Sequence, residues 1–305
     1  MNVCVSGHGT GWLPDYPDVR DYTAERDEVS ARLRSLGERD SVKAMLAKAA
    51  SPRRRGGALP AAIDLRRWCS RIEDQGELGS CTAHAVSSLV EYFERRAFGA
   101  HTEVSRLFVY KATRSLMRAD GDTGAFIRTA MGALAIFGAP PEEYWPYRPA
   151  AFDREPPAFC YAFARNYRAL SYYRLDPPGP SPAEVLSQLR TNLAAGLPAM
   201  FGFTVYDSIE GAASSGRIPF PSGGDGVAGG HAVAAVGYDD RMKIRGSSPR
   251  ARETTGALLV RNSWGAAWGE KGYGWLPYAY VLEGLADDFW SLLKNEWIDT
   301  GAFKA

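Results

Sequence analysis

The spacing of apolar residues changes part-way along the chain, and this change most constrains the fold. Before about residue 195 the spacing is helical, and after it short apolar runs predict strands. One helix begins after Ser80, which can cap it, and stops at Gly99; its apolar stripe comprises Ala85, Val86, Leu89, Val90 and Phe93. Other helices are predicted near 29–36, 40–50 and 125–137, and at 181–193 from the capping box Ser181-Pro182-Ala183-Glu184.

Strands are predicted at 199–205, 231–236, 257–260 and 273–276, with a long hairpin loop over 239–256. The pattern predicts an α+β protein.

Charge and composition exclude several classes of partner. The 305 residues carry 36 basic and 35 acidic side chains, a net charge of +1, so we expect neither nucleic acid nor a membrane surface as a partner. No apolar run is long enough to span a bilayer, and the first residues lack the basic and apolar regions of a Sec signal peptide. We therefore expect a cytoplasmic, monomeric protein, with export by a non-classical route left open.

Cysteine and histidine are too sparse for a disulfide scaffold or a zinc site. The four cysteines form no C-x-x-C pair, and none of the four histidines lies at ligand spacing from a cysteine pair. We expect no metal and no organic cofactor. Whether Cys69 and Cys160 pair is left open.

The N-terminal residues differ from the rest. Residues 12–22 carry two prolines and three aromatic residues without helical or strand periodicity, which predicts an extended segment lying along a surface. Residues 51–57 have the composition of a linker and include a basic triplet. We therefore divide the chain into an N-terminal arm (1–56), a mainly helical domain (57–165) and a β-rich domain (166–305).

Three segments carry residues suited to catalysis. Cys81 opens the central helix, where the helix dipole favours the thiolate; the alternative is an inert core residue. His231 begins an apolar strand, where it can act as a base or be a hydrogen-bonded strand-end residue. His84, three residues after Cys81, is the rival partner, although packing is the usual role at that spacing. Asn262 ends another strand, and its amide oxygen can orient an imidazole, with Trp264 shielding the bond.

Together these segments resemble the papain-like cysteine peptidases, and within them a bacterial branch that includes xylellain. The matching blocks are Gln75-Gly76-x-x-Gly79-Ser80-Cys81, Gly230-His231-Ala232-Val233 and Asn262-Ser263-Trp264-Gly265-x-x-Trp268-Gly269, within residues 60–280. The resemblance implies a two-domain fold with the site in the cleft between a helical and a β-barrel-like domain. This chain departs from the family's pattern at two positions. Leu78 stands where the family has a disulfide-forming cysteine, and Thr82 stands where it has an aromatic residue.

The resemblance also implies a role for each matching residue. Cys81 would be the nucleophile, His231 the acid and base, Asn262 the residue orienting His231, and Gln75 an oxyanion donor together with the Cys81 backbone N–H. Gly124, in the strip Asp122-Thr123-Gly124, together with Gly230 and Trp264, would border the substrate. The implied activity is that of an endopeptidase cleaving polypeptides through an acyl-thioester; the alternatives are a Cys-dependent acyl transferase and a catalytically silent binding module.

The same resemblance gives the N-terminal arm a role. Residues 1–56 would act like a propeptide, as in a zymogen, because mature enzymes of the family begin near the position of Gly57. We hypothesise that residues 12–22 cross the cleft and block substrate; the alternative is a permanent structural arm.

Overall fold

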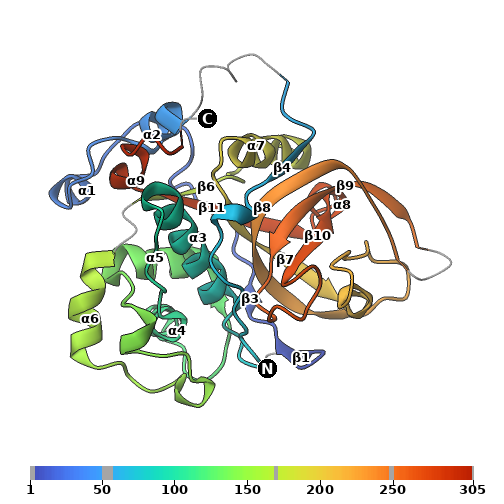
Figure 1. Cartoon of the computed structure of the whole chain (residues 1–305), viewed down its shortest axis with the longest axis horizontal. Helices are drawn as coiled ribbons and strands as arrows, with labels where there is room; N and C mark the ends of the chain where they lie inside the picture. Colours follow the sequence, from blue (N-terminus) through green and yellow to red (C-terminus); the bar gives the residue numbers. More distant parts are fainter. Residues whose placement is uncertain (1–3, 50–57, 168–170, 247–250, 304–305) are drawn as a thin grey trace.

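The computed structural model describes residues 4–49, 58–167, 171–246 and 251–303. A group of helices and a sheet lie side by side (Figure 1). The helical part contains α3 (Cys81–Phe98), α4 (Arg106–Met117), α5 (Ile127–Phe137) and α6 (Ala158–Ala164). Strands and helices are thus segregated along most of the chain, which confirms the α+β prediction.

The sheet is antiparallel, and β8 is its longest strand. In the described part of the chain seven strands join it, in the order β10-β9-β8-β7-β11-β6, with β4 also paired to β8. Their bounds are β4 (Ala62–Asp64), β6 (Ser171–Arg174), β7 (Ala199–Tyr206), β8 (Val227–Arg245), β9 (Glu253–Arg261), β10 (Tyr273–Pro277) and β11 (Ala286–Leu293). The predicted hairpin is present, but its loop over 239–256 was predicted too long, because β8 and β9 continue to pair beyond an irregularity after Asp239.

Helix α3 joins the two parts. It packs against β8 on one side and against α4 and α5 on the other, and every residue from Cys81 to Phe93 is buried. Its C-terminus is the predicted one, because Gly99 adopts the left-handed conformation that ends helices. The predicted cap was wrong: the Ser80 side chain makes no capping bond and instead contacts the hydroxyl of Tyr147 at 2.7 Å.

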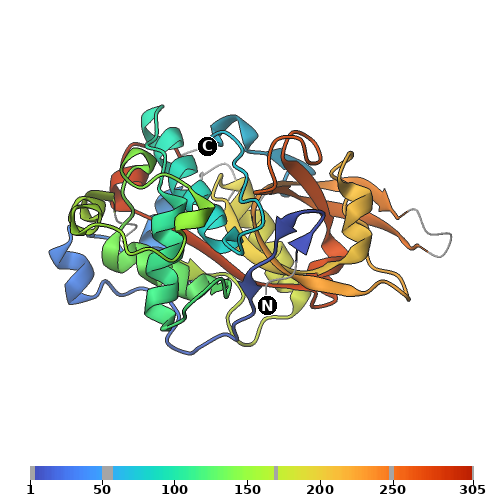
Figure 2. The same ribbon diagram turned by 90° about the horizontal axis from the view of Figure 1, so that it is seen from below.

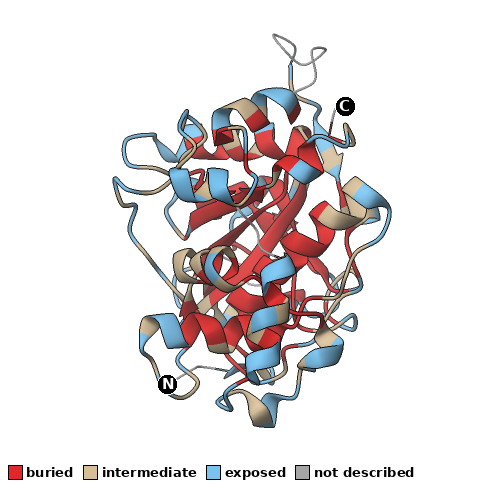
Figure 3. Ribbon diagram, turned by 90° about the vertical axis from the view of Figure 1, so that its left-hand side faces the viewer, coloured by how far each residue is buried: buried red, intermediate tan, exposed pale blue. Residues whose placement is uncertain are grey.

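The remaining helices lie in the second half of the chain and in the arm. The capping box at Ser181 is present and begins α7 (Pro182–Ala194), as predicted. It is followed by α8 (Tyr278–Leu282) and α9 (Asn295–Ile298), and the arm contains α1 (Ala31–Ser35) and α2 (Val42–Ala49). Figure 3 shows a buried interior enclosed by helices with exposed outer faces. Among the described helices, none has the length and apolar character needed to cross a membrane.

The N-terminal arm, described over residues 4–49, runs across the molecule between the helices and the sheet (Figure 2). It forms a small hairpin from β1 (Cys4–Val5) and β2 (His8–Gly9), and then β3 (Trp12–Leu13) pairs in parallel with β5 (Ala125–Phe126). Helix α2 buries Val42, Met45 and Ala49 and packs against α9. The predicted linker 51–57 and the boundary at 56/57 fall on residues 50–57, outside the described residues.

Candidate active site

Cys81 and His231 meet where the helix touches the sheet. Cys81 is the first residue of α3, His231 lies in β8, and both side chains are fully buried. The backbone N–H of Ala232 donates a hydrogen bond to the Cys81 Sγ at 3.4 Å, so β8 passes directly beside the thiol. The His231 Nδ1 is buried without a hydrogen-bond partner among the described residues. This nitrogen is therefore available to exchange a proton with a neighbouring group.

Asn262 fixes the other side of the His231 ring. Its Oδ1 lies 2.8 Å from the His231 Nε2 and also accepts the backbone N–H of Ser263 at 2.7 Å. The ring of Trp264 lies 4.6 Å from that of His231, and Trp268 packs edge-on against Trp264. Because all four side chains are buried, the two tryptophans shield the His231–Asn262 bond from water.

The side-chain amide of Gln75 is fixed by hydrogen bonds at both ends. Its Oε1 accepts a hydrogen bond from the Ser263 hydroxyl at 2.5 Å, which sets the orientation of the amide. Its Nε2 donates to the carbonyl oxygens of Leu78, at 2.8 Å, and Gly9, at 2.9 Å. One donor of Gln75 therefore holds a carbonyl group of the arm.

The arm fills the cleft through backbone contacts. The Gly11 N–H donates to the carbonyl of Gly230 at 3.0 Å, and the Gly11 carbonyl accepts the N–H of Ala125 at 2.8 Å. There is no room for a side chain: a Cβ on Gly11 would lie 2.0 Å from the Gly79 oxygen, and one on Gly124 would lie 2.4 Å from the Gly11 oxygen. The predicted strip at Gly124 thus receives the chain's own arm, and the contact begins at Gly9, earlier than the predicted start at Trp12.

Burial favours the neutral forms of Cys81 and His231. It raises the pKa of the Cys81 thiol to about 11, although N–H groups of Ala232 and Gly11 act in the opposite direction. It also lowers the pKa of His231 to about 4, against the hydrogen bond to Asn262. Both groups are neutral near pH 7 while the arm is in place. The thiolate expected from the helix dipole is not favoured here, because the buried sulfur has no solvent to stabilise a charge.

His84, the rival to His231, is tied to its own helix. Its Nδ1 lies 3.1 Å from the Ser80 carbonyl oxygen and 3.3 Å from the Ser80 hydroxyl. Burial lowers the pKa of His84 to about 3, so the ring is a neutral packing residue. All four cysteines are free, which settles the question left open for Cys69 and Cys160. Within the described ranges, no three or more His, Cys, Asp or Glu side chains gather in a way that could hold a metal ion.

Residues 59–281 match the family model of the papain family cysteine proteases. The chain belongs to this family. Two similar proteins cover almost its whole length. An uncharacterized peptidase C1-like protein of Acanthamoeba polyphaga mimivirus is 31% identical over 296 residues, which cover 95% of this chain and 88% of that protein. The crystal structure of xylellain, a cysteine protease from Xylella fastidiosa, is 31% identical, with a TM-score of 0.69 over 95% of this chain and 97% of that one.

A more distant structure shares the fold. The procathepsin B of Trypanosoma congolense is 17% identical, with a TM-score of 0.60 over 93% of this chain and 87% of that chain. The papain-like fold expected from the sequence is therefore confirmed, and this papain-family member is a cysteine peptidase.

Sequence reasoning missed the part of the arm that enters the cleft. Gly9 and Gly11 alternate in a short N-terminal run, and this spacing was the available signal for a close backbone approach. It also missed Asp288, which accepts a hydrogen bond from the Trp12 indole inside this papain-family site.

Proposed function

We propose that this papain-family peptidase hydrolyses peptide bonds with Cys81 as nucleophile. His231 takes the thiol proton and gives it to the leaving amine, while the sulfur bonds to the carbonyl carbon and forms an acyl-thioester that water then hydrolyses. The observation that carries the proposal is the His231 ring: Asn262 fixes it through Nε2, its Nδ1 has no partner among the described residues, and the next residue of β8, Ala232, bonds to the Cys81 sulfur. The Gln75 amide, oriented by Ser263, supports its role as an oxyanion donor.

We further propose that the arm inhibits the enzyme in this structure. The backbone N–H of Gly11 is one of the hydrogen-bond donors that act on the Cys81 sulfur, so the arm backbone lies against the thiol. At the same time the Gly9 carbonyl takes the Gln75 donor that an oxyanion would need. A groove of about 380 Å³ remains beside Trp264, lined by Val5, Ser6, His8, Asp74, Ile209, Glu210, Ala213 and residues 264–268.

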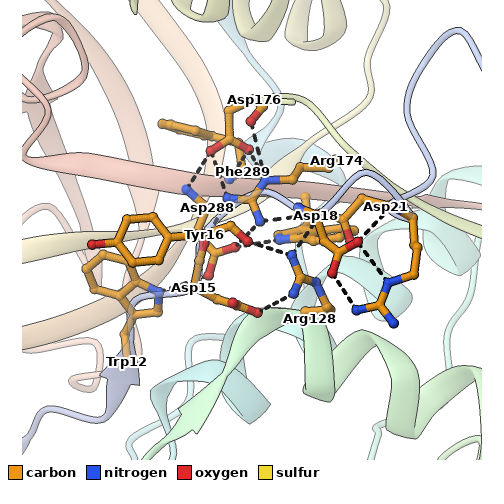
Figure 4. A network of polar contacts seen from close by, with 12 residues as sticks. Trp12, Asp15, Tyr16, Asp18, Asp21, Arg128, Arg174, Asp176, Asp288 and Phe289 are labelled. Atoms are coloured by element: carbon orange, nitrogen blue, oxygen red, sulfur yellow. Dashed lines mark hydrogen bonds and ion pairs between the residues drawn. The ribbon is translucent and has the colours of Figure 1, made fainter. Parts of the chain in front are cut away.

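Ion pairs and a backbone hydrogen bond hold the part of the arm that follows Trp12 in the sequence. Arg128 of α5 binds Asp15 at 2.9 Å and Asp21 at 2.8 Å (Figure 4). The Arg174 backbone N–H donates to the Tyr22 carbonyl at 2.7 Å. Helix α2 adds apolar burial against α9. These contacts support an inhibitor that stays docked while its cleft segment opens locally.

The test is peptide hydrolysis by the full chain carrying Trp12→Ala, a change that weakens the cleft segment without touching the proposed catalytic residues. We expect faster cleavage than with the wild type, and loss of cleavage when Cys81→Ala is added. Cleavage that survives Cys81→Ala would refute the catalytic assignment, and equal rates for Trp12→Ala and the wild type would refute inhibition by the arm.

A further inference from the structure

The indole of Trp12 occupies a closely fitting site in the cleft, which we call the Trp12 socket and define by Gly202, Gly230 and Asp288. A Cβ on Gly202 would lie 1.8 Å from the Trp12 Cε2, and one on Gly230 would lie 3.0 Å from the Trp12 Cε3. The Trp12 Nε1 donates to the Asp288 Oδ2 at 3.2 Å, and the side chain is buried. The two glycines make room for the flat ring, and the carboxylate accepts its polar edge.

Asp288 is an unusual residue for this position. It is fully buried, and it has a φ of 61° at an irregularity of β11 between Asp287 and Trp290. Left-handed backbone at a residue other than glycine is strained, and bulges of this kind redirect side chains next to active sites. The bulge therefore allows an acidic side chain, rather than an apolar one, to reach the socket.

Only one carboxylate oxygen of Asp288 contacts described residues outside the arm. Its Oδ1 accepts from the Trp290 Nε1 at 2.7 Å and lies 3.2 Å from the Arg174 guanidinium. Within the described chain, the Oδ2 accepts a hydrogen bond only from Trp12 (Figure 4). When the arm leaves, this oxygen becomes a buried acceptor that any ligand in the socket has to satisfy.

We propose that Asp288 makes the Trp12 socket select, from the side chains of a substrate, a large aromatic one with an N–H donor, tryptophan above all. This rests on the proposed peptidase function. The Gly230 carbonyl and the Ala125 N–H, which bind Gly11 next to Trp12, are the backbone groups that a substrate crossing Cys81 would meet. The substrate residue next to the one bound by these backbone groups would place its side chain in the Trp12 socket.

The charges around the socket favour a neutral donor over a cation. Arg174 already pairs with Asp288 and lies 3.0 Å from Asp176, so a lysine or arginine would enter beside an existing guanidinium. A phenylalanine or leucine would fill space but leave the Oδ2 without a partner. Tryptophan avoids both penalties.

The experiment compares two peptide series in the full chain carrying Trp12→Ala. One series places a single tryptophan at each of four positions around the scissile bond, and the other replaces it with benzothienylalanine, which has a ring of similar shape but no N–H. Because burial raises the pKa of Asp288 to about 7, the series is run at pH 8.5, where the group is a carboxylate. At one position we expect kcat/KM to be roughly 10-fold or more higher for tryptophan, the range of a hydrogen bond to a charged group. Equal values at all four positions would overturn the proposal.

Asp288→Asn tests the named residue. In this variant Trp290 and Arg174 would both bind the single amide oxygen, so the NH2 group would face the ligand. The ratio of kcat/KM for tryptophan to that for benzothienylalanine should then fall to near one. Asp287→Asn is the matched control, because Asp287 is the exposed neighbour, and it should keep the preference. A preference that survives Asp288→Asn would overturn the assignment of Asp288.

A binding measurement separates this proposal from the catalytic one. Indole and benzofuran, which lacks the donor, are titrated calorimetrically into the same Trp12→Ala protein. Tighter binding of indole by roughly 10-fold, together with no Cys81-dependent hydrolysis of any peptide, would refute the peptidase function but support the socket. Equal binding of both compounds would overturn the socket even if hydrolysis is observed.

Discussion

Gly11→Ala opens the cleft by a change in the arm alone. The added methyl group would lie 2.0 Å from the Gly79 oxygen and 2.5 Å from its carbonyl carbon, so the arm backbone has to move away. The move breaks the hydrogen bonds from Gly11 to Gly230 and from Ala125 to Gly11, worth about 1 kcal/mol each. Lifting Trp12 adds roughly 2 kcal/mol for an exposed aromatic side chain. The free energy of arm opening therefore falls by about 3–4 kcal/mol, which raises the open population on the order of 100- to 1000-fold.

The assay is the rate at which an epoxide thiol reagent labels Cys81 in the full chain, with the adduct located by peptide mass spectrometry because Cys4 is exposed. If opening limits access, the labelling rate rises by the same factor as the open population. Gly132→Ala is the matched control: it makes the same chemical change where a Cβ meets nothing within 4 Å, and it should leave the rate unchanged. Labelling of Gly11→Ala as slow as that of the wild type would refute the view that this segment closes the site.

Three further outcomes follow from the same geometry. Adding Asn262→Ala to Gly11→Ala should lower kcat for peptide cleavage roughly 100-fold with little change in KM, because His231 loses its orienting bond; an unchanged kcat would contradict this role. Labelling of wild-type Cys81 should accelerate about tenfold per pH unit from pH 7 to 10, since the covered thiol has a pKa of about 11 and only the thiolate reacts; a rate independent of pH over this range would argue against that state. Arg128→Ala should speed labelling at pH 7 by roughly 5- to 10-fold, because it removes partly exposed ion pairs to Asp15 and Asp21; a slower rate would count against Arg128 as an anchor.

The candidate site could be predicted because the proposed chemistry requires particular residue types within short motifs. A cysteine at a helix start, a histidine in an apolar strand and an asparagine at a strand end can each be identified locally, although β8 begins at Val227, earlier than the start predicted at His231. The structure brings Cys81, His231 and Asn262 to one place. Helix ends set by local signals, such as Gly99 and the Ser181 capping box, were also predictable.

Features that depend on distant partners could not be predicted in the same way. The Ser80 hydroxyl had a local capping role available, but Tyr147, far along the chain, provides a closer partner. Position 11 requires a glycine only because Gly79 and Gly124 lie against it. The irregularity at Asp288 breaks the alternation of β11, so neither the strand nor its buried acid could be identified from the sequence.

The most direct test of the account is the amount of acyl-enzyme on Cys81. The full-length wild type and Gly11→Ala are mixed with an activated ester of a peptide, quenched in acid, and digested, and the acylated peptide is measured by mass spectrometry. We expect a thioester on the peptide containing Cys81 in Gly11→Ala, far less in the wild type, and none when Cys81→Ala is added. Turnover of the ester without any acyl group on Cys81, or equal acylation of both proteins, would contradict a Cys81 nucleophile held closed by its own arm.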